Sequence, residues 1–216
     1  MKEIARKIVA ILHKNQHTLM KLFLNILFLF MGITVLQAQQ NYNEITADSA
    51  FTFKDSRDGK EYEALSYAGM IWMGENLRYN TKHSWCYEDK AGNCKEFGRL
   101  YTWEEAKSAC PKGWHLPSKH EWDTLITALG GYETAGHALA FGANLQFNIV
   151  FGYPPNVSGR YSSDDLQASF WSADENNAST AWVYYFIRDK LPLVYANYFS
   201  KNYGMMCRCV MDEGTK

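Results

Sequence analysis

The cysteines constrain the fold of this 216-residue chain more than any other feature. Five are present, all of them after an apolar segment near the N-terminus: Cys86, Cys94, Cys110, Cys207 and Cys209. Four can pair in two disulfides and one is left over, but the residues alone leave the pairing open. Metal binding is the alternative, because His83 lies close to Cys86. However, no C-x-x-C pair is present and the spacing matches no common zinc motif, so disulfides are expected.

The N-terminal segment indicates export to a compartment in which disulfides persist. Lys21 precedes an apolar run from Leu22 to Leu36, and the chain becomes polar after Ala38. A basic flank, a short apolar core and a small residue before a polar stretch are typical of a secretory signal peptide. The core of about 14 residues is shorter than the roughly 20 that a helix needs to span a bilayer. A signal anchor that is not cleaved is the alternative.

These features divide the chain into three parts. Residues 1–38 are expected to be a signal peptide, residues 39–50 a polar linker and residues 51–216 one globular domain. Cleavage would leave this domain secreted, periplasmic or at the cell surface, where an oxidising environment maintains disulfides.

The charge distribution disfavours two classes of partner. Residues 1–38 hold five of the 22 basic residues and one of the 23 acidic ones, so the remainder has 17 basic and 22 acidic side chains and a net charge of −5. Nucleic-acid binding depends on clustered Lys and Arg, which this balance disfavours. A polybasic membrane-surface protein is disfavoured for the same reason. We expect no nucleic-acid partner, and no membrane partner after signal cleavage.

Periodicity and turn residues predict an α+β domain. Asp58-Gly59 suits a hairpin between strands at 51–53 and 61–67. Further strands are expected at 69–76, 181–187, 193–199 and 205–211, and loops at 80–97 and 144–177.

Two helices are predicted from their start signals. Thr102 with Glu105, and Ser118 with Glu121, fit the capping box, in which a hydroxyl and a carboxylate satisfy free backbone N–H groups. Helices are therefore expected at 103–110 and 119–129, and a short third one at 132–141. The second carries Trp122, Leu125, Ile126 and Leu129 on one face at helical spacing.

Several stretches of the chain carry a specific pattern. They are GMIWMGENL at 69–77, GRLYTW at 98–103, CPKGWHLPS at 110–118, EW at 121–122, FWS at 170–172 and RCV at 208–210. In this order they resemble the Fibrobacter succinogenes major paralogous domain family. Its members are similar in layout to the C-type-lectin-like superfamily, which includes the formylglycine-generating enzymes. The resemblance implies a C-type-lectin-like fold, with a small, twisted, mostly antiparallel sheet, two main helices and long loops.

The resemblance also implies a cysteine pairing. In the superfamily layout, a Trp-x-x-Ala helix that ends in Cys is tied to a Cys on the final strand, which corresponds here to Cys110 and Cys209. Cys86 and Cys94 would then close a local loop. The family usually has an aliphatic residue at the position of Cys207, which implies a free thiol. Because Cys207 and Cys209 share a face of a strand, a competing pairing stays open. The tryptophans of the shared motifs are expected to be buried.

No catalytic motif is present. The chain has no G-x-S-x-G, no H-E-x-x-H and no phosphate-binding Gly loop. The superfamily suggests oxidation of a substrate cysteine, which needs reactive cysteines in a cleft, with a lowered thiol pKa or a bound copper. Cys207 and Cys209 are close enough for this role, but the family pattern uses Cys209 structurally. For His115, hydrogen bonding within a turn is favoured over acid–base chemistry or ligation.

Ligand binding is expected in the loop region between residues 144 and 177. The candidate residues are Tyr153, Tyr161, Asp174, Glu175, Asn176 and Asn177. Tyrosines in a loop can stack on sugars or contact a protein surface. The consecutive carboxylates and amides have the oxygens that calcium prefers. The Glu-Pro-Asn and Trp-Asn-Asp signatures of sugar-binding C-type lectins are absent, however, so a solvated loop is favoured and no cofactor is expected.

The sequence thus favours an exported, non-catalytic module that binds a glycan or a surface protein. A cysteine-oxidising enzyme of the formylglycine-generating type and a structural cell-surface component are the alternatives.

Overall fold

A computed structural model describes residue 26 and residues 50–141, 147–152 and 166–214. The chain divides into two units, residues 1–44 and 45–216, and the fold below is that of the second. The signal peptide, most of the linker, and Tyr153 and Tyr161 lie outside the described residues. None of the described helices is long and apolar enough to cross a membrane.

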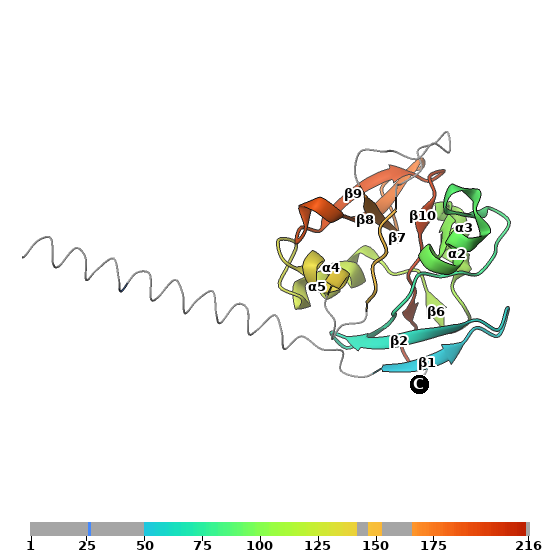
Figure 1. The fold of residues 1–216 in the computed structure, drawn as a ribbon, viewed down its shortest axis with the longest axis horizontal. Coiled ribbons are helices and arrows are strands. Elements are labelled where there is room, and N and C mark those ends of the chain that lie inside the picture. The colour runs from blue at the N-terminus through green and yellow to red at the C-terminus, as the bar shows by residue number, and fades with distance from the viewer. Residues whose placement is uncertain (1–25, 27–49, 142–146, 153–165, 215–216) are drawn as a thin grey trace, which may run out of the picture. The chain divides into compact units, whose positions relative to one another are not determined.

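The described strands form two sheets (Figure 1). The first has the order β1-β2-β3-β11-β6 and the second the order β4-β5-β10-β7-β8-β9. The first contains β1 (Ala50–Lys54), β2 (Glu61–Tyr67), β3 (Met70–Met73), β6 (Trp114–His115) and β11 (Val210–Met211). The second contains β4 (Ser84–Cys86), β5 (Arg99–Tyr101), β7 (Gln167–Glu175), β8 (Thr180–Ile187), β9 (Tyr195–Ser200) and β10 (Met205–Met206). Within these sheets only β10 and β7 pair in parallel, so the strands are mostly antiparallel.

The helices are short and lie beside the sheets. They are α2 (Ala91–Phe97), α3 (Trp103–Ala109), α4 (Lys119–Ala128) and α5 (Ala135–Phe141), with single 3-10 turns at η1 (Tyr87–Asp89) and η2 (Arg188–Lys190). In Figure 1, α2 and α3 lie on one side of the strands, and α4 and α5 on the other. The α+β class is confirmed.

Three segments differ from the sequence predictions. Residues 80–97 were expected to be a loop, but they contain β4, η1 and α2, because β4 pairs with β5 across a short connection. The loop expected at 144–177 ends in β7, whose residues 168–172 are buried between neighbouring strands. The single strand expected at 205–211 is two strands in different sheets, because the chain crosses from one sheet to the other between them.

The two helix starts have different chemistry. At α4 the capping box is confirmed: Glu121 N–H donates to Ser118 Oγ at 3.2 Å, and Ser118 N–H donates to Glu121 Oε2 at 2.6 Å. At α3 the box is wrong, because the side chain of Thr102 makes no capping hydrogen bond. Instead, Trp103 N–H donates to the carbonyl oxygen of Lys201 at 3.0 Å, so a tertiary contact occupies the first free donor of the helix.

Tryptophans of the family-like motifs build the core. All five are buried: Trp72, Trp103, Trp114, Trp122 and Trp171. Two of them join α3 and β5 to β7, since Trp103 Nε1 donates to Ser172 O and Trp171 Nε1 donates to Tyr101 O, both at 2.8 Å. These bonds satisfy polar atoms that would otherwise be buried without a partner. The motifs therefore specify the frame of the domain.

A buried polar cluster sets the corner at which α2 leads into β5. Arg208, which is fully buried, donates from Nε to Asn76 Oδ1 at 3.1 Å, and the amide of Asn76 donates to Phe97 O at 2.9 Å. Gly98 follows with a φ of +78°, and a Cβ at this position would lie 2.5 Å from Cβ of Asn76. Only glycine fits such a close approach without displacement. This corner sets the position of Arg99, at the start of β5, relative to α2.

Candidate functional site

The disulfides frame the domain at two places. Cys110, at the end of α3, is bonded to Cys209, 99 residues later, in the segment that crosses between the sheets. Cys86, at the end of β4, is bonded to Cys94 in α2. These are the pairs that the family resemblance implies. The long link joins a helix to the C-terminal segment, whereas the short one closes residues 86–94 on themselves.

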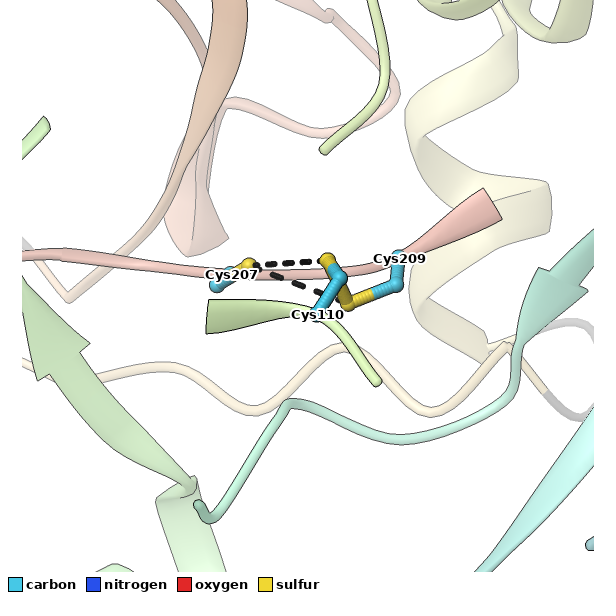
Figure 2. A group of neighbouring side chains, drawn as sticks. All are labelled: Cys110, Cys207 and Cys209. Carbon is cyan, nitrogen blue, oxygen red and sulfur yellow. Dashed lines mark hydrogen bonds between the residues drawn. A yellow bond between two sulfur atoms is a disulfide. The ribbon is translucent and has the colours of Figure 1, made fainter. Parts of the chain in front are cut away.

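Cys207 is a free thiol beside the long disulfide (Figure 2). Its Sγ lies 3.8 Å from Sγ of Cys110 and 3.9 Å from Sγ of Cys209. In the part of the chain that the structure describes, these three sulfurs are the one group of Cys, His, Asp and Glu atoms close enough to hold a metal. Burial raises the pKa of the Cys207 thiol to about 12, so it stays protonated at neutral pH. A protonated, buried thiol is a poor nucleophile and a poor ligand.

Both ring nitrogens of His115 are hydrogen-bonded to carboxylates. Its Nε2 lies 2.7 Å from Glu121 Oε1 and its Nδ1 lies 2.6 Å from Asp212 Oδ1. The hydrogen bond to Glu121, followed by the one to Asp212, raises the pKa of His115 to about 9, although burial opposes this. The imidazolium therefore links α4 to the residue after β11. With both nitrogens occupied, His115 has no free position for acid–base chemistry or metal ligation.

The four polar candidates of the long loop lie at the end of β7 and in the following turn. Asp174 Oδ2 accepts from Lys119 N–H at 2.5 Å, at the start of α4. Glu175 is exposed and pairs with Lys201, with Nζ and Oε2 2.6 Å apart. The two acidic residues therefore have different partners on different elements.

The two asparagines belong to the turn itself. Asn176 Nδ2 donates to Thr180 Oγ1 at 3.1 Å, and Asn177 Oδ1 accepts from the N–H groups of Ser179 and Thr180 at 2.9 and 3.0 Å. These bonds stabilise the connection between β7 and β8. The side chains of residues 174–177 therefore contact different partners: the start of α4, Lys201 and the turn itself.

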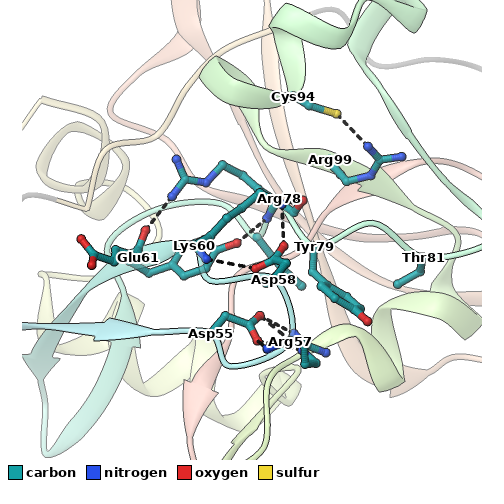
Figure 3. A network of polar contacts seen from close by, with 12 residues as sticks. Asp55, Arg57, Asp58, Lys60, Glu61, Arg78, Tyr79, Thr81, Cys94 and Arg99 are labelled. Atoms are coloured by element: carbon teal, nitrogen blue, oxygen red, sulfur yellow. Dashed lines mark hydrogen bonds and ion pairs between the residues drawn. The ribbon is translucent and has the colours of Figure 1, made fainter.

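A cationic pocket, which sequence analysis missed, includes Cys94 of the short disulfide in its lining. Figure 3 shows five of the lining residues: Lys60, Glu61, Arg78, Cys94 and Arg99. Its volume is about 500 Å³, within the range of pockets that hold small ligands. Four cationic side chains line it: Lys60, Arg78, Lys95 and Arg99. Glu61 and Asn80 line it too, and so do Ala91 and Cys94 of α2. The walls come from the start of β2, from the chain after β3, from α2 and from β5.

The four cations differ in their partners. Lys60 Nζ lies 2.5 Å from Asp58 Oδ2, and Arg78 Nη2 lies 3.0 Å from Glu75 Oε2. Arg99 has neutral acceptors only. Nε donates to Ser84 Oγ at 3.0 Å and Nη2 to Ser84 O at 2.7 Å, and Nη1 donates to the sulfurs of Cys94 and Cys86 at 3.2 and 3.7 Å. Among the residues that the structure describes, neither Arg99 nor Lys95 has a carboxylate within ion-pair distance.

The fold and the pocket define a small α+β domain with two disulfides and a cationic surface site. The family model of the Fibrobacter succinogenes major domain matches residues 65–211, so the chain belongs to this family. The match runs from β2 to β11 and excludes Lys60 and Glu61 of the pocket. No curated protein matches the chain, and no solved structure does.

Proposed function

We propose that the protein is an exported binding module whose ligand, a glycan or a segment of a surface protein, enters the cationic pocket. The pocket carries this proposal, because it combines a volume of about 500 Å³ with polar groups from four separate segments of the chain. Its walls are held by the short disulfide and by the bonds of Arg99 to Ser84, so the site is preorganised. A preorganised site loses less entropy on binding.

The cysteine chemistry supports binding over oxidation of a substrate cysteine. Cys86, Cys94, Cys110 and Cys209 are consumed in disulfides, and Cys207 is fully buried with a raised pKa. A cysteine-oxidising enzyme needs reactive cysteines in a cleft, with a lowered thiol pKa or a bound copper, and a buried, protonated thiol beside a closed disulfide is a different environment.

The same disulfides support export, since such bonds persist in oxidising compartments. Cleavage near Ala38 is the corresponding proposal. Intact-mass analysis of the protein from its native host should give a chain that starts near Gln39. A mature chain that keeps Leu22 to Leu36 would overturn it and make the protein membrane-anchored.

We also propose that the fold is a variant of the C-type-lectin-like fold. The bond between Cys110, at the end of the Trp-x-x-Ala helix, and Cys209, just before the last strand, agrees with the layout of that superfamily. An experimental structure superposed on members of the superfamily tests this. A different order of strands in the two sheets would reject it.

Binding at the pocket is tested by a variant that fills it. Ala91 is exposed at the start of α2 and lines the pocket, so Ala91→Trp places a large side chain there without disturbing the core. We expect any ligand found in a screen of glycans and surface proteins to bind the wild type and not the variant. A ligand that binds both equally would show that the site lies elsewhere.

A further inference from the structure

We propose that the pocket selects a ligand that bears a sulfate or carboxylate group, and that Arg99 and Lys95 bind this anion. The inference rests on the proposed function of the pocket and names the class of its ligand.

The first observation is the charge balance within the pocket. Four cationic side chains line it against one carboxylate, Glu61. Lys60 and Arg78 are partly neutralised by Asp58 and Glu75, but Arg99 and Lys95 have no such partner among the described residues. The guanidinium of Arg99 is half-buried, where an unpaired charge attracts an anion more strongly than in open water.

The second observation is the position of Arg99. Its side chain is held by Ser84, through Nε and Nη2, and by the sulfur of Cys94, through Nη1. Nη1 also donates to Cys86 Sγ at 3.7 Å. All of these acceptors are neutral, so they orient the guanidinium but leave its charge uncompensated. A planar, oriented guanidinium suits the paired oxygens of a sulfate or a carboxylate. Lys95, one residue after Cys94 in α2, adds a second charge at the same pocket.

The third observation is the character of the remaining lining. No aromatic residue is among the side chains that line the pocket. A neutral sugar would therefore lack the stacking surface that aromatic side chains provide. Asn80, which is exposed at the rim, can donate to and accept from hydroxyl groups.

The charge of the whole domain makes this cluster significant. The chain after residue 38 carries a net charge of −5. The four cationic side chains around one pocket therefore form a local positive charge on a domain whose net charge is negative. A general anion-binding surface would need a basic protein. A local cationic pocket in an acidic domain favours a ligand with one or a few anionic groups over a polyanion that wraps the surface.

Three dextran oligomers of equal length provide the test: unmodified, carboxymethylated and sulfated. Binding to the full exported protein is measured by calorimetry, for the wild type and for three variants. Lys95→Gln together with Arg99→Gln removes both unpaired charges, and Lys95→Glu reverses one of them without touching a contact that holds β4 to β5. Lys112→Gln is the matched control, because Lys112 is exposed and does not line the pocket.

We expect the wild type and Lys112→Gln to bind the sulfated or the carboxymethylated oligomer and to ignore the unmodified one. Both pocket variants should lose about tenfold or more in affinity, the effect of one charge-assisted hydrogen bond. Which of the two charged oligomers binds identifies the anionic group. Charged oligomers that bind Lys95→Glu as tightly as the wild type would overturn the inference.

The failure of this inference differs from the failure of the proposed function. A neutral ligand that Ala91→Trp excludes, but that binds the charge variants normally, leaves the function intact and rejects the anion. A ligand that is unaffected by Ala91→Trp rejects the pocket itself.

Discussion

The two disulfides should differ in their contribution to stability because they close loops of different length. Cys110 and Cys209 are 99 residues apart in sequence, whereas Cys86 and Cys94 are 8 apart. In the chain-entropy model, closing about 100 residues stabilises the fold by about 4.7 kcal/mol, and closing about 8 residues by about 2.5 kcal/mol. The expected difference is therefore about 2 kcal/mol.

The measurement needs a background without the free thiol, since Cys207 lies within 4 Å of both sulfurs of the long bond and can exchange with it on unfolding. Two double variants are compared, both in Cys207→Ala protein. The first carries Cys110→Ala and Cys209→Ala together, and the second carries Cys86→Ala and Cys94→Ala together. Guanidinium unfolding gives the free energies of unfolding. The first pair of substitutions should cost more by about 2 kcal/mol. An equal or larger loss from the second pair would refute the reasoning.

Further predictions concern single residues. Ser118→Ala should lower the free energy of unfolding by about 1 kcal/mol, because it removes a capping hydrogen bond that Thr102→Ala does not remove; urea melts compare the two. Gly98→Ala should destabilise by about 1–3 kcal/mol in thermal melts, since the residue has a positive φ and its Cβ would collide with Asn76, and an unchanged melting temperature would contradict this. Folding raises the pKa of His115 to about 9, so its protonated form stabilises the folded state. This stabilisation is complete below about pH 6.5 and is lost as the pH rises to about 9. The stability difference between wild type and His115→Gln should shrink over that range, and a difference that grows would refute the ion pairs.

Much of the frame could be predicted from local sequence. Ser118 begins a helix through contacts within four residues, and Asp58-Gly59 closes a hairpin between adjacent strands. Both signals are local, so they are readable from the chain alone. The start of α3 was placed correctly, but its capping bond was not, because the partner of Trp103 N–H is Lys201, almost a hundred residues away.

The candidate site was not predictable in the same way. Lys60, Arg78, Lys95 and Arg99 come from elements that only the fold brings together, and each alone looks like an ordinary surface cation. The oxygen-bearing side chains of residues 174–177 are consecutive in sequence, which suggests a ligand site, but consecutive residues of a strand and a turn point in different directions. The one local signal of the pocket was the density of cations around Cys94, which precedes Lys95 directly and Arg99 by five residues.

The central claim is that a ligand binds in the cationic pocket, and amide chemical shifts test it most directly. The labelled protein is titrated with the oligomer that binds in calorimetry, and the backbone shifts of the described residues are followed. The largest changes should cluster at four residues that line the pocket from α2, β5 and the loop between β3 and β4: Asn80, Ala91, Lys95 and Arg99. Changes centred on Asn176 and Asn177 in the turn after β7, with none at Lys95 and Arg99, would contradict the account.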